Sequence, residues 1–101
     1  MGEHSGLKMI GAALLGSDLR QINLRHADLR RLILRRTDLW GAKLNGADLR
    51  DANLGRAILK DAGVIGVKAS GVRFCKTMLR SGKVMKPSCR WRRIKAPHNI
   101  V

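Results

Sequence analysis

Three histidines, two cysteines and a set of regularly spaced aspartates are the side chains that are able to do acid–base, metal or nucleophilic chemistry. His4, His26 and His98 do not stand beside a carboxylate or a cysteine in a catalytic or metal-ligand pattern. Asp18 and Asp28 are typical of the aspartates, which precede leucine in a repeat, so hydrogen bonding within turns is favoured over acid–base work. No glycine-rich phosphate loop is present. The sequence therefore predicts no enzyme, no cofactor, no metal and no small-molecule substrate.

The two cysteines, Cys75 and Cys89, fit neither a metal-ligand spacing nor a CxxC redox motif. Two reduced thiols are the expected state. A disulfide that ties the tail to the end of the repeat region is the first alternative, and a shared metal site is the second.

Positive charge is the chemical feature that stands out. The chain has 21 lysines and arginines against seven acids, a net charge of +14. Residues 1–72 hold twelve of these cations and all seven acids, whereas residues 73–101 hold nine cations and no acid. Repulsion between so many like charges favours an acidic partner.

A cluster of candidate partner-binding residues lies in this tail, namely Arg90, Trp91, Arg92, Arg93 and Lys95. Aromatic side chains interleaved with arginines suit single-stranded nucleic acid, on which they stack. Tryptophan and arginine are equally favoured as anchors in protein interfaces. A disordered tail that only keeps the protein soluble is the third interpretation.

The elements that position these charges are indicated by a leucine at every fifth residue. The period continues more weakly through Val64, Ala69 and Phe74. A helix requires a period of 3.6 and a strand a period of 2, so a fixed period of five indicates a solenoid of stacked turns. The regular leucines are Leu14, Leu19, Leu24, Leu29, Leu34, Leu39, Leu44, Leu49, Leu54 and Leu59.

Two further positions of each unit are regular. A small residue, usually alanine, lies two residues before most leucines, and aspartate or asparagine often precedes the leucine directly, as in HADLR, GADLR and DANLG. With three positions in agreement over many units, residues 10–76 resemble the pentapeptide-repeat family. The resemblance implies an all-β fold, a right-handed quadrilateral β-helix with four pentapeptides per coil and about three coils. The leucine and the small residue would point inward, and coils would stack about 4.8 Å apart.

The ends of such a tube need caps, because an uncovered coil is a sticky sheet edge. We expect an N-terminal cap at residues 1–9, the β-helix at 10–76, and a basic C-terminal cap and tail at 77–101. The segment TMLRSGKVM is expected to form a short helix or a hairpin that packs Met78, Leu79, Val84 and Met85 over the far end. Phe74 is a candidate plug of the tube.

The twenty-residue coil predicts that residues twenty apart stack, and this register gathers cations on one of the four sides. That side holds no acid, and Arg36, Arg56 and Lys76 form one column on it. Stacked like charges repel, so either a partner bridges the column with anions, or the long side chains spread into solvent. The candidate partner-binding residues of this side are Arg35, Arg36, Arg56, Arg73 and Lys76.

Charge also separates the function classes. Mimicry of DNA, the best-known activity in the resembled family, needs an acidic surface and is excluded by the sign of the charge. The favoured hypothesis is a structural or linker protein that docks on acidic protein subunits of a larger assembly. The alternative is a nucleic-acid-binding module, for RNA or a ribonucleoprotein, that is blind to sequence because the repeat offers no base-reading element.

No stretch of eighteen apolar residues is present and no secretory signal is recognised, so a cytoplasmic or plastid-stromal protein is expected. The segment GVRFCKTMLRSGKVMKPSC resembles the end of many cyanobacterial pentapeptide-repeat proteins, although Leu79, Arg80 and Ser81 replace the usual Pro-Asp before the glycine. This resemblance makes a phycobilisome or another photosynthetic complex one setting for the linker hypothesis, since phycobilisome pigment subunits are acidic and their linkers basic.

Overall fold

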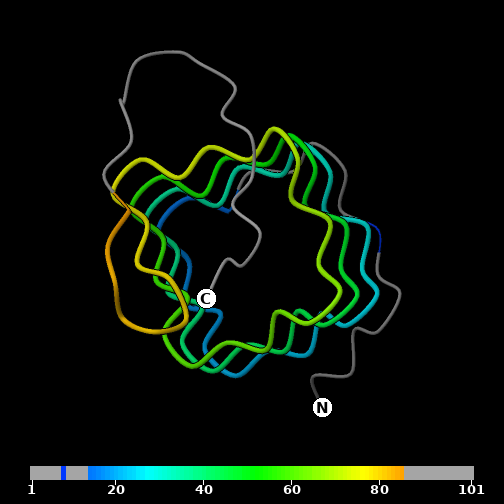
Figure 1. Cartoon of the computed structure of the whole chain (residues 1–101), viewed down its shortest axis with the longest axis horizontal. Coiled ribbons are helices and arrows are strands. Elements are labelled where there is room, and N and C mark those ends of the chain that lie inside the picture. Colours follow the sequence, from blue (N-terminus) through cyan, green and yellow to red (C-terminus); the bar gives the residue numbers. More distant parts are fainter. Residues whose placement is uncertain (1–7, 9–13, 86–101) are drawn as a thin grey trace.

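The computed structural model describes Lys8 and residues 14–85, which wind into a four-sided tube of stacked turns (Figure 1). The expected N-terminal cap, apart from Lys8, and the tail beyond residue 85 lie outside the described residues.

Stacking of residues twenty apart builds the tube. Asp18 bridges Asp38, which bridges Ile58, which in turn bridges Met78, all in the parallel sense. The backbone hydrogen bonds fit the same step, since Asn53 pairs with Ile33 by accepting from the Leu34 amide at 2.8 Å and donating to the Leu32 carbonyl at 2.9 Å. In the described part of the chain each side of a turn is a single β-bridge, with no helix and no longer strand. The predicted twenty-residue register is confirmed.

A tight turn at each corner connects one side to the next. The amide of the small residue donates to the carbonyl of the leucine three residues earlier, as from Ala27 to Leu24 at 3.1 Å. The residue before the small one is left-handed, with φ of 55–62° where it is not glycine. Among the described residues, eight that are not glycine adopt this conformation, which costs L-residues energy. We attribute this conformation to the hydrogen bonds that the two neighbouring sides make.

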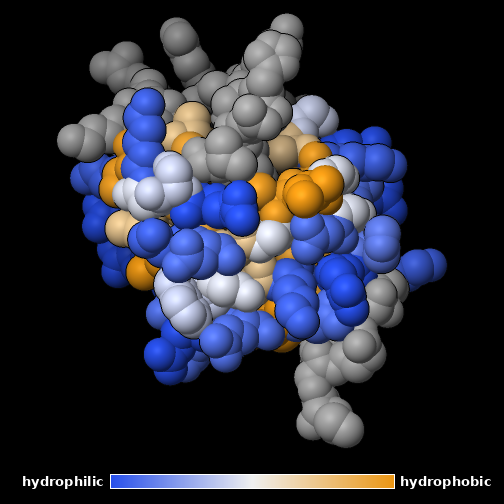
Figure 2. Space-filling view, turned by 60° about the horizontal axis from the view of Figure 1, so that its bottom comes forward, coloured by the Kyte–Doolittle hydropathy of each residue, from blue (hydrophilic) through white to orange (hydrophobic). Residues whose placement is uncertain are grey.

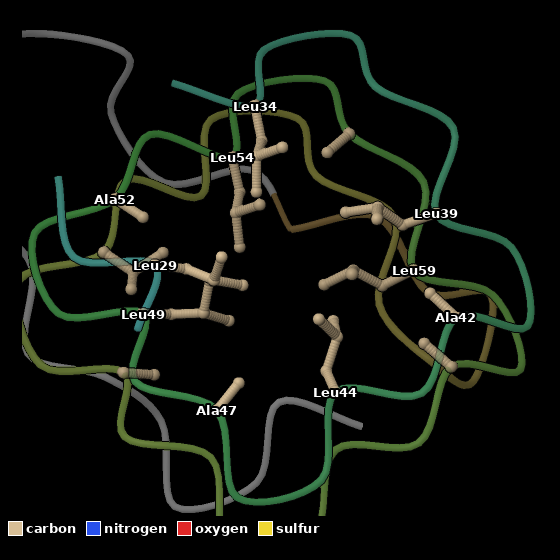
Figure 3. Close-up of a cluster of buried hydrophobic side chains, with 14 of the residues drawn as sticks. Leu29, Leu34, Leu39, Ala42, Leu44, Ala47, Leu49, Ala52, Leu54 and Leu59 are labelled. Atoms are coloured by element: carbon tan, nitrogen blue, oxygen red, sulfur yellow. The ribbon is translucent and has the colours of Figure 1, made fainter. Parts of the chain in front are cut away.

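The leucines of the repeat point into the tube from all four sides, with alanines between them (Figure 3). Every regular leucine from Leu29 to Leu59 is fully buried, and so is Phe74, which continues the column of Leu34 and Leu54. Leu14 and Leu19, at the N-terminal end of the described tube, are only partly buried. The sequence prediction of inward leucines is confirmed.

Two threonines replace alanine at the small position, and both are fully buried. The Thr37 hydroxyl donates to the Leu14 carbonyl at 3.0 Å and the Thr77 hydroxyl to the Leu54 carbonyl at 2.6 Å. Each bond ties one coil to the coil before it. Among the described residues no buried side-chain nitrogen or oxygen lacks a partner.

A hairpin turns the chain back after the last complete side. Met78 pairs with Val84 in the antiparallel sense, and the Met85 amide donates to the Thr77 carbonyl at 2.8 Å. Gly82, with φ of 90°, makes the reversal. Of the two forms expected for this segment, the hairpin is the one observed. Leu79 and Met85 pack on the core, while Val84 is exposed.

Candidate functional site

The four sides of the tube differ in the charge that they present. We name them by their described residues: the basic side, 14–16, 32–36, 52–56 and 72–76; the Trp40 side, 17–21, 37–41, 57–61 and 77–81; the opposite side, 22–26, 42–46 and 62–66; and the mixed side, 27–31, 47–51 and 67–71. The opposite side lies across the tube from the basic side.

Aspartates neutralise arginines on the Trp40 and mixed sides. The Arg30 guanidinium donates to both carboxylate oxygens of Asp28 at 2.8 Å, and Arg50 does the same to Asp48 at 2.9 and 2.6 Å. Arg20 forks onto Asp18 in the same way at 2.9 Å. In each pair the carboxylate also accepts the backbone amide of the arginine, so it holds the turn as well.

These bonds lower the pKa of each carboxyl group. The side-chain hydrogen bond from Arg50 is the largest cause of the lowered pKa of Asp48, and Arg30 and Arg20 act in the same way on Asp28 and Asp18. The aspartates therefore remain anionic down to a lower pH than usual. The turn role expected for these residues from the sequence is confirmed.

The basic side has no acid among its described residues. The structure brings together all five of its predicted residues, as the register predicted. Arg35, Arg36, Arg56 and Lys76 are exposed and form no ion pair with a described residue, while Arg73 is half-buried. The Arg35 side chain lies over Gly55, whose missing Cβ would sit 3.7 Å from Cγ and Nε of Arg35. Its charge is thereby held close to the tube.

The column Arg36–Arg56–Lys76 differs from the columns at the other corners. On the opposite side His26 is followed, one coil on, by Gly46, which leaves room for the imidazole ring. The other two corner columns also alternate: Gln21 is followed by Gly41, and Arg31 by Asp51. Only at the corner of the basic side, within the described residues, do three long cations follow one another with no glycine or acid between them.

The five tail residues predicted for partner binding, from Arg90 to Lys95, lie outside the described residues. Cys75 is half-buried and disulfide-bonded. The expectation of reduced thiols is therefore wrong for Cys75, because its sulfur is bonded in a disulfide.

An apolar groove on the Trp40 side was missed by the sequence analysis, which did not bring these residues together. Six residues line it, namely Arg20, Asp38, Trp40, Ile58, Lys60 and Met78. The twenty-residue register contains the signal, because it stacks Met78 on Ile58 beside Trp40. Met78 was instead assigned to the terminal cap.

Hydrophobic side chains are sparse elsewhere on the surface. Figure 2 shows one face dominated by hydrophilic side chains, with hydrophobic ones in small separate patches. Ile65, on the opposite side, is 82% exposed. No cluster of three histidine, cysteine, aspartate or glutamate side chains able to hold a metal occurs in the described part of the chain.

A family model for pentapeptide repeats matches the chain in eight copies, over residues 5–41, 22–61 and 41–74. The matched segments cover most of the chain, and their residues 14–74 coincide with the stacked turns. The chain belongs to the pentapeptide-repeat family. The sequence resemblance is thereby confirmed. Among proteins with curated descriptions, none is detectably similar to this chain.

Three solved structures of pentapeptide-repeat proteins match parts of the chain. The protein Rfr23 from the cyanobacterium Cyanothece 51142 is 26% identical, with a TM-score of 0.50 over 65% of this chain and 59% of its own. HetL from the cyanobacterium Nostoc sp. strain PCC 7120, a protein involved in heterocyst differentiation regulation, is 30% identical over 82% of this chain and 43% of its own, with a TM-score of 0.31. A protein of the Arabidopsis thaliana thylakoid lumen is 27% identical over 78% and 69%, with a TM-score of 0.41.

The pentapeptide-repeat chain is thus a right-handed β-helix, the fold of this family. Pentapeptide-repeat proteins are in general structural and protein-interaction modules. The chain spans 59% and 43% of the lengths of the two cyanobacterial relatives. No helix among the described residues is long and apolar enough to cross a membrane.

Proposed function

We propose that this pentapeptide-repeat chain is a non-enzymatic linker that docks on acidic protein subunits of a larger assembly, through its basic side and its C-terminal tail. The observation that carries the proposal is the uninterrupted column of Arg36, Arg56 and Lys76. It stands out because arginines on two other sides are neutralised by aspartates at 2.6–2.9 Å.

The column is costly for the isolated molecule. Its cations are one coil apart, about 4.8 Å, and like charges at this spacing repel. Each also occupies a left-handed position, with φ of 58, 58 and 55°. Carboxylates of a partner would remove the repulsion and would accept charge-assisted hydrogen bonds from the guanidinium groups.

A photosynthetic complex of a cyanobacterium or plastid, such as the phycobilisome, is one setting for this linker. Support comes from the FCKTM segment near the end of the repeat and from the cyanobacterial origin of Rfr23. In such a setting the protein would act in the cytoplasm or stroma.

A native pull-down of the full chain, with nuclease added, tests the proposal. Acidic proteins should remain bound after nuclease treatment and should be lost in the double variant Arg36→Glu/Arg56→Glu. The matched control is Arg31→Glu/Lys43→Glu, which changes the net charge equally but lies on the mixed and opposite sides. Arg31 has the same backbone conformation as Arg36, with φ of 59°.

Equal capture by both double variants would refute docking through the basic side. Loss of the captured material on nuclease treatment, with recovery of RNA or DNA, would establish the alternative, a nucleic-acid-binding module. Its affinity would then fall with salt at a slope set by the number of phosphates neutralised.

A further inference from the structure

The groove on the Trp40 side has an apolar floor and a partly exposed aromatic wall. Ile58 and Met78 stack in one column along the tube axis and are half-buried. Trp40 stands beside them with 40% of its surface exposed. Its backbone is fixed, because its amide donates to Asp38 at 3.1 Å and its carbonyl accepts from Gln21 at 2.8 Å. The indole is therefore presented to solvent from a rigid support.

The charged residues around this groove are already paired. Arg20 bonds Asp18 at 2.9 Å and lies 4.0 Å from Asp38, while Lys60 lies 3.5 Å from Asp61. The groove itself is thus close to neutral, and its attraction for a partner is mainly apolar.

The basic column of Arg36, Arg56 and Lys76 runs along the corner that borders the groove. In each coil the chain passes from a column cation through one buried residue to a groove residue: from Arg56 through Ala57 to Ile58, and from Lys76 through Thr77 to Met78. An apolar strip and a cationic strip therefore run side by side, parallel to the tube axis.

We propose that these two strips form one docking surface for an acidic amphipathic helix of a protein partner. Apolar side chains of the helix pack on Trp40, Ile58 and Met78, while its carboxylates face Arg56 and Lys76. The proposal rests on the proposed function and names the element of the acidic partner that binds. An aromatic anchor that becomes buried on binding, beside a charged rim, is the usual anatomy of a protein interface.

The spacing of the cations favours a helix over an extended strand. Neighbouring cations of the column are about 4.8 Å apart, and helix positions three or four residues apart are separated by about 5–6 Å. Two coil steps, about 9.6 Å, compare with about 10.5 Å for seven helical residues. Residues on the same face of a strand lie about 6.8 Å apart. This distance does not match the spacing of the cations in the column.

The test uses a fluorescein-labelled synthetic helix of about eighteen residues, five turns, with a stripe of leucines next to a stripe of glutamates. Binding to the full-length protein is measured by fluorescence anisotropy. Two control peptides replace all leucines by serine or all glutamates by glutamine. We expect the parent peptide to bind and to shift the Trp40 indole NMR signal, identified by its loss in Trp40→Phe, and we expect both control peptides to bind about tenfold or more weakly.

Protein variants separate the two strips. Trp40→Ala should weaken binding about tenfold without changing its salt dependence, whereas Arg56→Glu should weaken binding and flatten the salt dependence. Ile65→Ser, which removes an exposed apolar side chain from the opposite side, should change neither the affinity nor its salt dependence. Circular dichroism and thermal melting show that each variant is folded, and Ile58→Thr provides a second test of the apolar strip.

Three outcomes would overturn the docking surface. If Arg56→Glu abolishes binding while Trp40→Ala and Ile58→Thr leave it intact, the apolar strip has no part, and docking through the basic side alone stands. If none of these variants matters, both proposals fail. If a labelled single-stranded oligonucleotide binds more tightly than the peptide and depends on Trp40, the surface is a nucleic-acid site.

Discussion

The aspartates that precede four of the repeat leucines show how one side chain serves both the turn and the surface charge. Asp48 accepts the Arg50 amide at 3.2 Å and the Arg50 guanidinium at 2.9 and 2.6 Å, so a single residue fixes the turn and cancels a cation. Gly55 occupies the position of Arg50 in the next pentapeptide, and Asn53 accepts its amide at 3.0 Å without cancelling any charge. The choice of aspartate or asparagine therefore sets the charge of a side without altering its turn.

Loss of the Arg50 guanidinium should raise the pKa of Asp48. In Arg50→Gln the largest cause of the lowered pKa is gone, so the carboxyl titration followed by NMR should move up towards the ordinary value of about 3.9. Because the folded pKa of the wild-type carboxyl is lowered, its contribution to stability is present above pH of about 4 and is lost as the pH falls through the folded pKa. On acidification, the free energy of unfolding of Arg50→Gln should therefore fall by less than that of the wild-type protein. An unchanged Asp48 titration would show that the ion pair does not form in solution.

A methyl group at Gly46 should destabilise the tube. An added Cβ would collide with Nδ1 of His26, and the φ of 72° is unfavourable for alanine. Gly46→Ala should cost about 1–3 kcal/mol in chemical denaturation. Gly16→Ala is the matched control, since its φ is 66° and no atom lies within 4 Å of the added Cβ. Equal losses in both would assign the cost to backbone conformation alone.

At the scale of the coil, stability comes from one leucine per side in a narrow interior. Leu44→Ala should cost about 2–5 kcal/mol, because the neighbouring coils cannot close the cavity. Leu15→Ala, at a leucine that is 60% exposed, should change the unfolding free energy by at most about 0.5 kcal/mol. Urea denaturation of both variants checks the difference. Similar losses would contradict the inward and outward assignment of these two leucines.

The sequence predicted the coil well because the repeat states its own register. The twenty-residue spacing alone predicts that Leu34, Leu54 and Phe74 form an interior column. The same spacing predicted that Arg36, Arg56 and Lys76 lie together. Left-handed corners were beyond sequence reasoning, because residues as different as Gln21 and Arg31 adopt φ near 60° under the hydrogen bonds of two adjoining sides. Glutamine and arginine have no local preference that would predict a left-handed backbone.

The groove escaped prediction for a different reason. Met78 was assigned to the cap, so the column that it forms with Ile58 was not traced. A disulfide at Cys75 was only the first alternative to reduced thiols in the sequence analysis, since the spacing of the two cysteines matches no motif.

At the scale of the whole molecule, a net charge of +14 on 101 residues should make stability depend on salt. We expect the melting temperature of the full chain to rise by several degrees between about 0.01 and 0.5 M sodium chloride, as the screening length shortens. Arg36→Gln/Arg56→Gln should melt at a higher temperature than wild type at low salt, and the difference should shrink at high salt.

Arg20→Gln is the control for that prediction, because Arg20 is paired with Asp18. Its removal lowers the net charge but also breaks a bidentate bond, so it should not stabilise the protein at low salt. If Arg20→Gln raises the melting temperature at low salt as much per charge as Arg36→Gln/Arg56→Gln does, the salt dependence comes from the net charge of the molecule and not from the column.

The twenty-residue step also constrains how such a gene can change. Loss of a single pentapeptide would keep every leucine inside, yet it would rotate all later residues by a quarter turn. Arg36 would then remain on one side while Arg56 and Lys76 moved to its neighbour, and the column would be divided. Duplication or loss of four pentapeptides preserves every column and alters only the length of the tube. Surface patterns of this kind are therefore inherited intact through recombination in steps of a whole coil and are erased by shorter ones.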